Sequence, residues 1–159
     1  MQECPELEEM EAKARDALRQ TAEALDGRSV IVDGEAITRP FELARTLLEN
    51  GFSVHSVYEQ KLLPSDRQDF EWLREHHPRI SIRQTLHPKE TVSDPEAADC
   101  IAIGYSAGYL SGAKHVADIG GQNGLYGYHG VYTLMDLIRE AAETETDMRR
   151  LLEDAVLVI

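Results

Sequence analysis

The chain has 159 residues, of which 42% are apolar and 28% are charged, a composition typical of one globular domain with its own core. Its net charge of −13 argues against nucleic acid and anionic membranes as partners, because both would repel it. We find neither a transmembrane run nor a signal peptide, so we expect a cytoplasmic protein. The two cysteines, Cys4 and Cys100, lack CxxC spacing, and Cys100 is expected to be a small buried residue.

The first half of the chain alternates helical and strand patterns. Apolar residues at steps of three and four predict a helix from Pro5 to Leu25. The β-branched run Val30–Val32 predicts a strand that is buried on both faces. A short helix around Phe41–Leu48 and a strand at Phe52–Tyr58 then complete a βαβ unit.

The second half continues this alternation. We predict further strands at Arg79–Gln84 and Cys100–Gly104, a short one at Ala117–Ile119, and helices from about Ser65 to Pro78, over Leu110–Val116, over Val131–Ala142 and from Asp147 to about Val156. Consecutive parallel strands need a crossover connection, which is usually a helix, so this alternation predicts a parallel sheet. The predicted fold class is therefore α/β, doubly wound, with a mostly parallel sheet of about four or five strands. Residues 28–159 form one domain, and residues 1–27 form an N-terminal helix that packs on it.

Ligands of such sheets bind beyond the carboxyl ends of the strands, so the residues just after each strand are the candidates for a site. Here they are Gly34–Glu35, Glu59–Gln60, Leu86–His87, Tyr105–Ser106 and the glycine-rich segment 120–130.

The glycine-rich segment is the strongest candidate because it joins flexible backbone to a helix start. An anion or a metal cluster would suit it, although glycines that only allow close helix packing explain it equally well. His129 has three interpretations, as a ligand, as an acid/base group or as a hydrogen-bonded packing residue, and the last is commonest for a lone histidine. No metal ligand is predicted. The candidate cofactor-binding residues are Gly120, Gly121, Gln122, Gly124, Tyr126, Gly127, Tyr128, His129 and Gly130.

Ser106 lies in Gly104-Tyr105-Ser106-Ala107-Gly108, which matches the G-x-S-x-G pattern of a nucleophile elbow. Asp118 and His129 follow in the order that a hydrolase triad needs, but little chain separates them. A helix N-cap serine is the simpler interpretation, and the hydrolase remains a third hypothesis.

Three stretches resemble one known family. They are Asp99–Gly104 with the helix that follows, Gly124–Val131, and the opening segment with Gly27–Val30 and Leu47–Val54. In order and spacing these stretches resemble the C-terminal, Rossmann-like domain of nitrogenase component 1-type oxidoreductases. Gly127-Tyr128-His129-Gly130 matches the aromatic glycine stretch that opens a long helix in that family.

The resemblance implies an oxidoreductase domain that takes part in electron transfer through iron–sulfur or related metal clusters. Such clusters are held together with other domains or subunits of a nitrogenase-like complex, which supply most cysteine ligands; a homo-oligomer is a further option. In catalytic subunits of the family a histidine ligand precedes the aromatic stretch, whereas here Asp118–Asn123 contains neither His nor Cys. The isolated chain is therefore not expected to be catalytic. The alternative is a non-catalytic module or scaffold that binds a metal cluster, a tetrapyrrole or a small anion.

Overall fold

A five-stranded, all-parallel sheet forms the centre of the protein, as seen in a computed structural model that describes residues 5–86, 94–119, 125–148, 150, 151 and 153. The strand order is β3-β2-β1-β4-β5. This confirms the predicted doubly wound α/β class. The strands are β1 (Ser29–Asp33), β2 (Ser53–Tyr58), β3 (Ser81–Arg83), β4 (Ile101–Ile103) and β5 (His115–Ala117).

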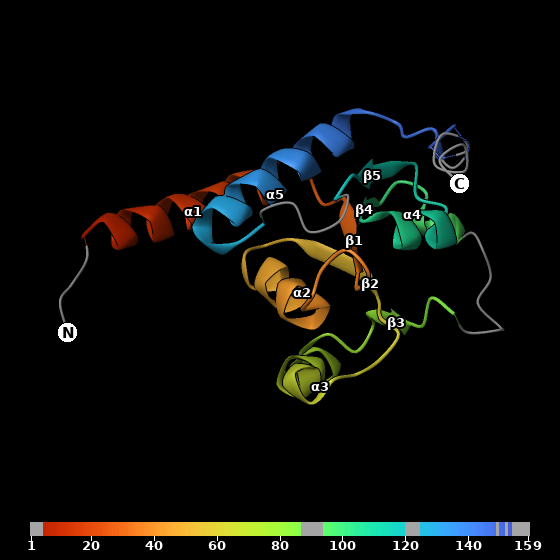
Figure 1. Ribbon diagram of the computed structural model, residues 1–159, viewed down its shortest axis with the longest axis horizontal. Coiled ribbons are helices and arrows are strands. Elements are labelled where there is room, and N and C mark those ends of the chain that lie inside the picture. Colours follow the sequence, from red (N-terminus) through yellow and green to blue (C-terminus); the bar gives the residue numbers. More distant parts are fainter. Residues whose placement is uncertain (1–4, 87–93, 120–124, 149, 152, 154–159) are drawn as a thin grey trace.

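The helices divide between the two faces of this sheet. On one face α2 and α5 cover a large apolar core, and α1 lies alongside α5 (Figure 1). On the other face α4 covers a smaller core that includes Ile31, Ala102 and Val116. The helices are α1 (Pro5–Ala24), α2 (Pro40–Glu49), α3 (Arg67–His76), α4 (Tyr105–Ser111) and α5 (Gly127–Glu143), with 3-10 turns at Pro64–Asp66 and Pro95–Ala97.

The alternation of apolar residues explains the central strand. Val30 and Val32 belong to the large core and Ile31 to the smaller one, and all three are fully buried. A strand in this position needs apolar side chains on both faces, which is why β1 reads as a continuous β-branched run. Among the described helices, none combines the length and apolar character that crossing a membrane requires.

Several predicted boundaries were wrong. The short strand expected at Ala117–Ile119 is β5 at His115–Ala117, and the helix expected from Leu110 already starts at Tyr105. The helix expected over Leu110–Val116 ends at Ser111, because Gly112 adopts a left-handed conformation with φ of 74° and closes it. His115, expected near a helix end, therefore lies in β5. The last long helix starts at Gly127 rather than Val131, and β3 is only three residues long. Half of the helix predicted from Asp147 to about Val156 lies outside the described residues, and the described residues Met148, Arg150, Leu151 and Glu153 are helical.

A bulge interrupts β2 next to β1. Val54 pairs with Val30, but Ile31 pairs with Ser56, so His55 has no partner in β1. As a result His55 and Ser56 point toward the same side, and His55 Nδ1 lies 3.2 Å from Ser56 Oγ. Bulges of this kind redirect side chains and are frequent beside functional sites.

Candidate functional site

The switch point of the sheet lies between β1 and β4. From β1 the chain winds outward through β2 to β3, and then returns to β4 on the other side of β1 and continues to β5. In open parallel sheets this reversal leaves a crevice beyond the carboxyl ends of the two central strands. The segments that flank the crevice are Asp33–Glu35 after β1 and Gly104–Ser106 after β4.

Asp33 links these two segments. Its side chain is buried and accepts hydrogen bonds from the backbone N–H groups of Ala107 and Glu35, each at 2.9 Å. Burial raises the pKa of Asp33 above its ordinary value, although both backbone amides act in the opposite direction. Gly104, with φ of 116°, comes so close that a Cβ there would lie 2.6 Å from Asp33 Cβ. The sequence patterns did not identify Asp33 as a site residue, because it is the last residue of a buried strand and belongs to no motif.

Glu35 is the polar centre of the crevice. Ser106 Oγ donates to Glu35 Oε2 at 2.6 Å, while Gln60 Nε2 and Thr85 Oγ1 lie 3.3 and 3.4 Å from Oε1. Gln60 also contacts Thr85 directly. Ser106 follows β4, Gln60 follows β2 and Thr85 follows β3. The exposed Glu35 carboxylate therefore contacts side chains from the ends of three other strands. The structure thus brings together three of the predicted candidates, Glu35, Gln60 and Ser106, and adds Thr85.

Glu59 closes the crevice on the β2 side. Its Oε1 accepts hydrogen bonds from the backbone N–H groups of Gln60 and Lys61, at 2.6 and 3.2 Å. A Cβ on Gly34 would lie 2.8 Å from the Tyr58 backbone oxygen and 2.3 Å from Glu59 Oε2, so the glycine allows a close approach of β1 and β2 here. With Asp33 and Glu35 nearby along the same edge, the crevice is acidic and suits a ligand with hydroxyl or cationic groups better than a phosphate.

Tyr105 and Asp118 join the ends of β4 and β5. Burial, together with a hydrogen bond to the Asp118 carboxylate and its charge, raises the pKa of Tyr105 to about 12. The phenol therefore stays protonated and acts as a donor at neutral pH.

The predicted candidates after β3 were Leu86 and His87. Leu86 is 79% exposed, and His87 lies outside the described residues.

The glycine-rich segment is described only in part, since residues 120–124 fall outside the described ranges, and with them the candidates Gly120, Gly121, Gln122 and Gly124. Of the remaining candidates, Tyr126 is 75% exposed and His129 is exposed. Gly130 lies against the backbone of Leu125, because a Cβ at Gly130 would lie 2.3 Å from the Leu125 carbonyl carbon.

Two further candidates in this segment have contacts within the fold. Gly127 adopts a φ of 58°, which glycine accommodates most easily. Tyr128 Oη lies 3.4 Å from Glu11 Oε2, so it ties the start of α5 to α1. Close packing and backbone conformation therefore account for the two described glycines of the motif, and cofactor binding by this segment stays a prediction.

The geometry at Ser106 differs from a nucleophile elbow. An elbow holds its serine in a strained turn, whereas Ser106 lies in the first turn of α4, and Asp26 is the one non-glycine residue with positive φ in the described part of the chain. The Ser106 hydroxyl bonds to Glu35, and Asp118 bonds to Tyr105. Ser106 therefore fits neither a hydrolase triad nor the predicted helix N-cap, because Gly104 is the N-cap of α4.

The cysteine available in the described residues does not fit a cluster ligand. Iron–sulfur clusters are held mainly by thiolates. Cys100 is buried, and its burial, with the charges of Asp94 and Asp99, raises its pKa to about 11. Its Sγ lies 3.7 Å from the backbone oxygen of Glu96. Cys4 lies outside the described residues. Within those residues, no group of three His, Cys, Asp or Glu side chains has the geometry to hold a metal ion.

Comparison of the chain with protein-family models, with curated proteins and with solved structures finds no match.

Proposed function

We propose that this chain is a domain of a nitrogenase component 1-like oxidoreductase that works with other domains or subunits. The carboxyl edge of its sheet is the face turned toward the cofactor that they share. The observation that carries this proposal is a set of large apolar side chains exposed in the segments that leave or approach this edge. They are Leu62 at 47%, Leu63 at 48%, Leu86 at 79% and Tyr126 at 75% exposure.

Exposed apolar side chains that gather at one place are typical of interaction sites. Leu62 and Leu63 follow β2, Leu86 follows β3, and Tyr126 immediately precedes α5. By chain order, all four lie in the connections that follow the carboxyl ends of β2, β3 and β5.

The role of this chain in the proposal is positioning rather than ligation. The described residues at the edge offer carboxylates, hydroxyls and an amide, whereas a cluster needs thiolates. Cluster ligands would therefore come from the partner, as the family resemblance implies. The cluster would supply the electrons, and Glu35 and Ser106 would orient polar groups next to it.

The test is anaerobic purification of the tagged chain from cells of its source. We expect it to bring down a cysteine-containing partner together with iron and acid-labile sulfide. The double substitution Leu86→Asp and Tyr126→Asp should remove partner, iron and sulfide together. Leu7→Asp is the matched control, because Leu7 is also exposed, at 53%, but lies on α1. Recovery of the chain without iron or sulfide, or equal loss in the control, contradicts the proposal.

A non-catalytic binding module is the second candidate, and the arrangement at Glu35 favours it. An exposed carboxylate ringed by two hydroxyls and an amide can bind a polar ligand without any redox chemistry. The same purified material separates the two functions. A bound group whose absorbance does not change on addition of dithionite supports the binding module, and a reversible change supports the oxidoreductase.

A further inference from the structure

A cleft of about 680 Å³ lies at the opposite edge of the sheet, where the strands begin. The first residues of β1, β2 and β3 are Ser29, Ser53 and Ser81, and all three line it. The remaining wall comes from the ends of α2 and α3 and from the approach to the 3-10 turn at Pro95. Clefts of this size accommodate small organic ligands.

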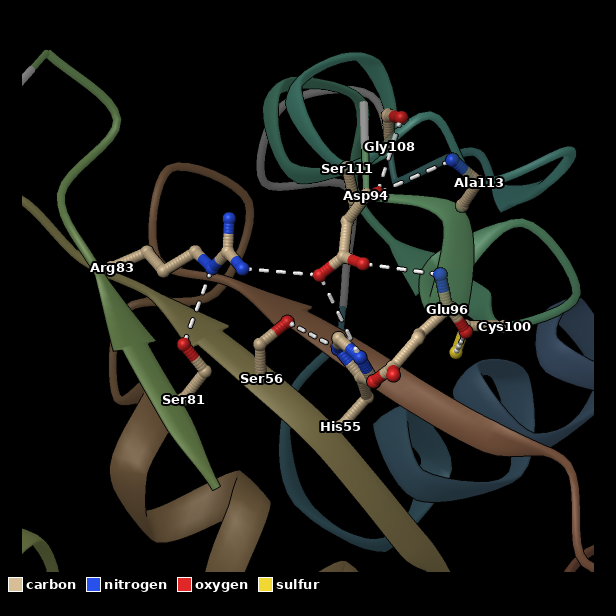
Figure 2. A network of polar contacts seen from close by, with 10 residues as sticks. All are labelled: His55, Ser56, Ser81, Arg83, Asp94, Glu96, Cys100, Gly108, Ser111 and Ala113. Carbon is tan, nitrogen blue, oxygen red and sulfur yellow. Dashed lines mark hydrogen bonds and ion pairs between the residues drawn. The ribbon is translucent and has the colours of Figure 1, made fainter. Parts of the chain in front are cut away.

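A polar network fixes one side of the cleft (Figure 2). Asp94 Oδ2 accepts a hydrogen bond from Arg83 Nη2 at 3.0 Å, and Asp94 Oδ1 accepts one from the Glu96 backbone N–H at 3.0 Å. Arg83 Nε also donates to Ser81 Oγ at 3.2 Å. The Asp94 side chain is only 17% exposed, so the contact with Arg83 largely neutralises its charge.

The bulge in β2 brings a histidine into this network. His55 Nε2 lies 3.8 Å from Asp94 Oδ2, and Figure 2 shows the imidazole between Ser56 and Asp94. Without the extra residue in β2, His55 and Ser56 would point to opposite faces of the sheet. The bulge therefore brings an imidazole onto this wall, with its two ring nitrogens near Ser56 and Asp94.

The opposite wall carries a cation, the guanidinium of Arg79. Arg79 lines the cleft and is exposed, and within the described residues it makes no hydrogen bond or ion pair. His76 and His77 lie beside it at the end of α3. Of the carboxylates on the cleft wall, Asp94 is paired with Arg83, which leaves Glu96 as the opposing charge. Basic and imidazole groups thus collect here in a chain whose net charge is −13.

We propose that this cleft binds a small organic anion. Arg79 holds the carboxylate or phosphate head, assisted by the hydroxyls of Ser53 and Ser81. The apolar body of the ligand lies against Phe52 and Ile80, which also line the cleft. Guanidinium groups bind both kinds of head through paired hydrogen bonds. This site is separate from the carboxyl edge, so its test is independent of the function proposed above.

Trp72 provides a built-in reporter of binding. It is the only tryptophan of the chain, and its ring stacks on His76 at 4.8 Å and lies 5.3 Å from His77. A ligand that contacts these histidines should change the tryptophan fluorescence. The probes are phenyl phosphate and benzoate, which separate the two head groups, with phenol as the uncharged control. We expect a saturable change with at least one anion and none with phenol at the same concentration.

Two variants locate the site. Arg79→Gln should weaken binding of the anion at least about tenfold, since it removes a charge-assisted hydrogen bond. Ser53→Glu places a negative charge at an exposed position of the cleft and should abolish binding. Arg74→Gln is the matched control, because it removes an exposed arginine of α3 whose guanidinium lies over the Phe70 ring at 5.8 Å and does not line the cleft.

Two results overturn the proposal. One is the absence of any saturable change with both phenyl phosphate and benzoate, while circular dichroism shows a folded protein. The other is binding by Arg79→Gln and Ser53→Glu that is as tight as binding by Arg74→Gln, which would place the bound anion elsewhere.

Discussion

Ser106 Oγ lies 2.6 Å from Glu35 Oε2, although 71 positions separate the two residues in the sequence. The contact spans the switch point of the sheet, because Glu35 follows β1 and Ser106 follows β4. It is the shortest of the contacts that join Glu35 to three neighbouring strand ends. The two central segments are thereby held together at the place where a ligand would enter.

The first prediction concerns this hydrogen bond. Ser106→Ala and Glu35→Gln should each lower the free energy of unfolding by about 1 kcal/mol, because a charge-assisted bond is lost at a solvent-exposed site. The double variant should lose less than the sum of the two, which denaturant unfolding of all four proteins measures as a coupling energy. Strict additivity would show that the two side chains do not interact in solution.

The second prediction concerns the close approach of β1 and β4. Gly104→Ala should lower the free energy of unfolding by at least about 3 kcal/mol, because it adds a Cβ 2.6 Å from Asp33 Cβ at a φ of 116°. Gly27→Ala is the control, since Gly27 has a φ of 82° but nothing within 4 Å of an added Cβ. It should cost only about 1 kcal/mol. Equal costs would mean that the space around Gly104 is not restricted.

The third prediction follows from the raised pKa of Asp33. When the pKa of an acid is higher in the folded than in the unfolded state, the folded state binds more protons between the two values, and stability falls as pH rises through that window. The stability of the wild type relative to Asp33→Asn should therefore decrease from about pH 4 upward and level off above the folded pKa. Urea unfolding of both proteins between pH 4 and 7 measures this difference. An increase with pH would show that the two backbone N–H groups outweigh burial.

The fourth prediction concerns the thiol of Cys100. With a pKa of about 11, its thiolate fraction at pH 8 is about a hundredfold smaller than that of a free cysteine. In a Cys4→Ser background, Ellman's reagent should therefore react at least about a hundredfold more slowly with the folded protein than with the protein in denaturant. Comparable rates in the two states would contradict both the burial and the raised pKa of Cys100.

The central part of the fold was predictable because its signals are local. The β-branched run at Val30–Val32 could only be a strand buried on both faces, and the structure buries all three residues. Asn50-Gly51 and Pro78 mark helix ends close to where α2 and α3 stop. Such signals depend on the residues themselves, since glycine permits positive φ and proline fixes φ wherever they occur.

The edge strands were harder to predict. Three residues each form β3 and β5, and Ile82 of β3 is 37% exposed, so neither strand has the alternation that marks a longer one. Gly112 was the missed signal for the end of α4, because a glycine after a helix often adopts the left-handed conformation observed here. The bulge at His55 left no pattern in the sequence, because it is defined by pairing with β1.

The candidate site also has a part that local sequence patterns predict and a part that they do not. Residue patterns alone predict the alternation of strands and helices, and with it the positions after each strand at which Glu35, Gln60 and Ser106 are found. The folded chain was needed to show that Gln60 and Ser106 meet on the Glu35 carboxylate, that Asp33 accepts a hydrogen bond from the Ala107 backbone, and that Arg79 and His55 line one cleft. Helix and strand formation follows from short-range backbone and side-chain preferences, whereas the neighbours of a side chain across the sheet depend on strand order and register, which packing of the whole chain sets.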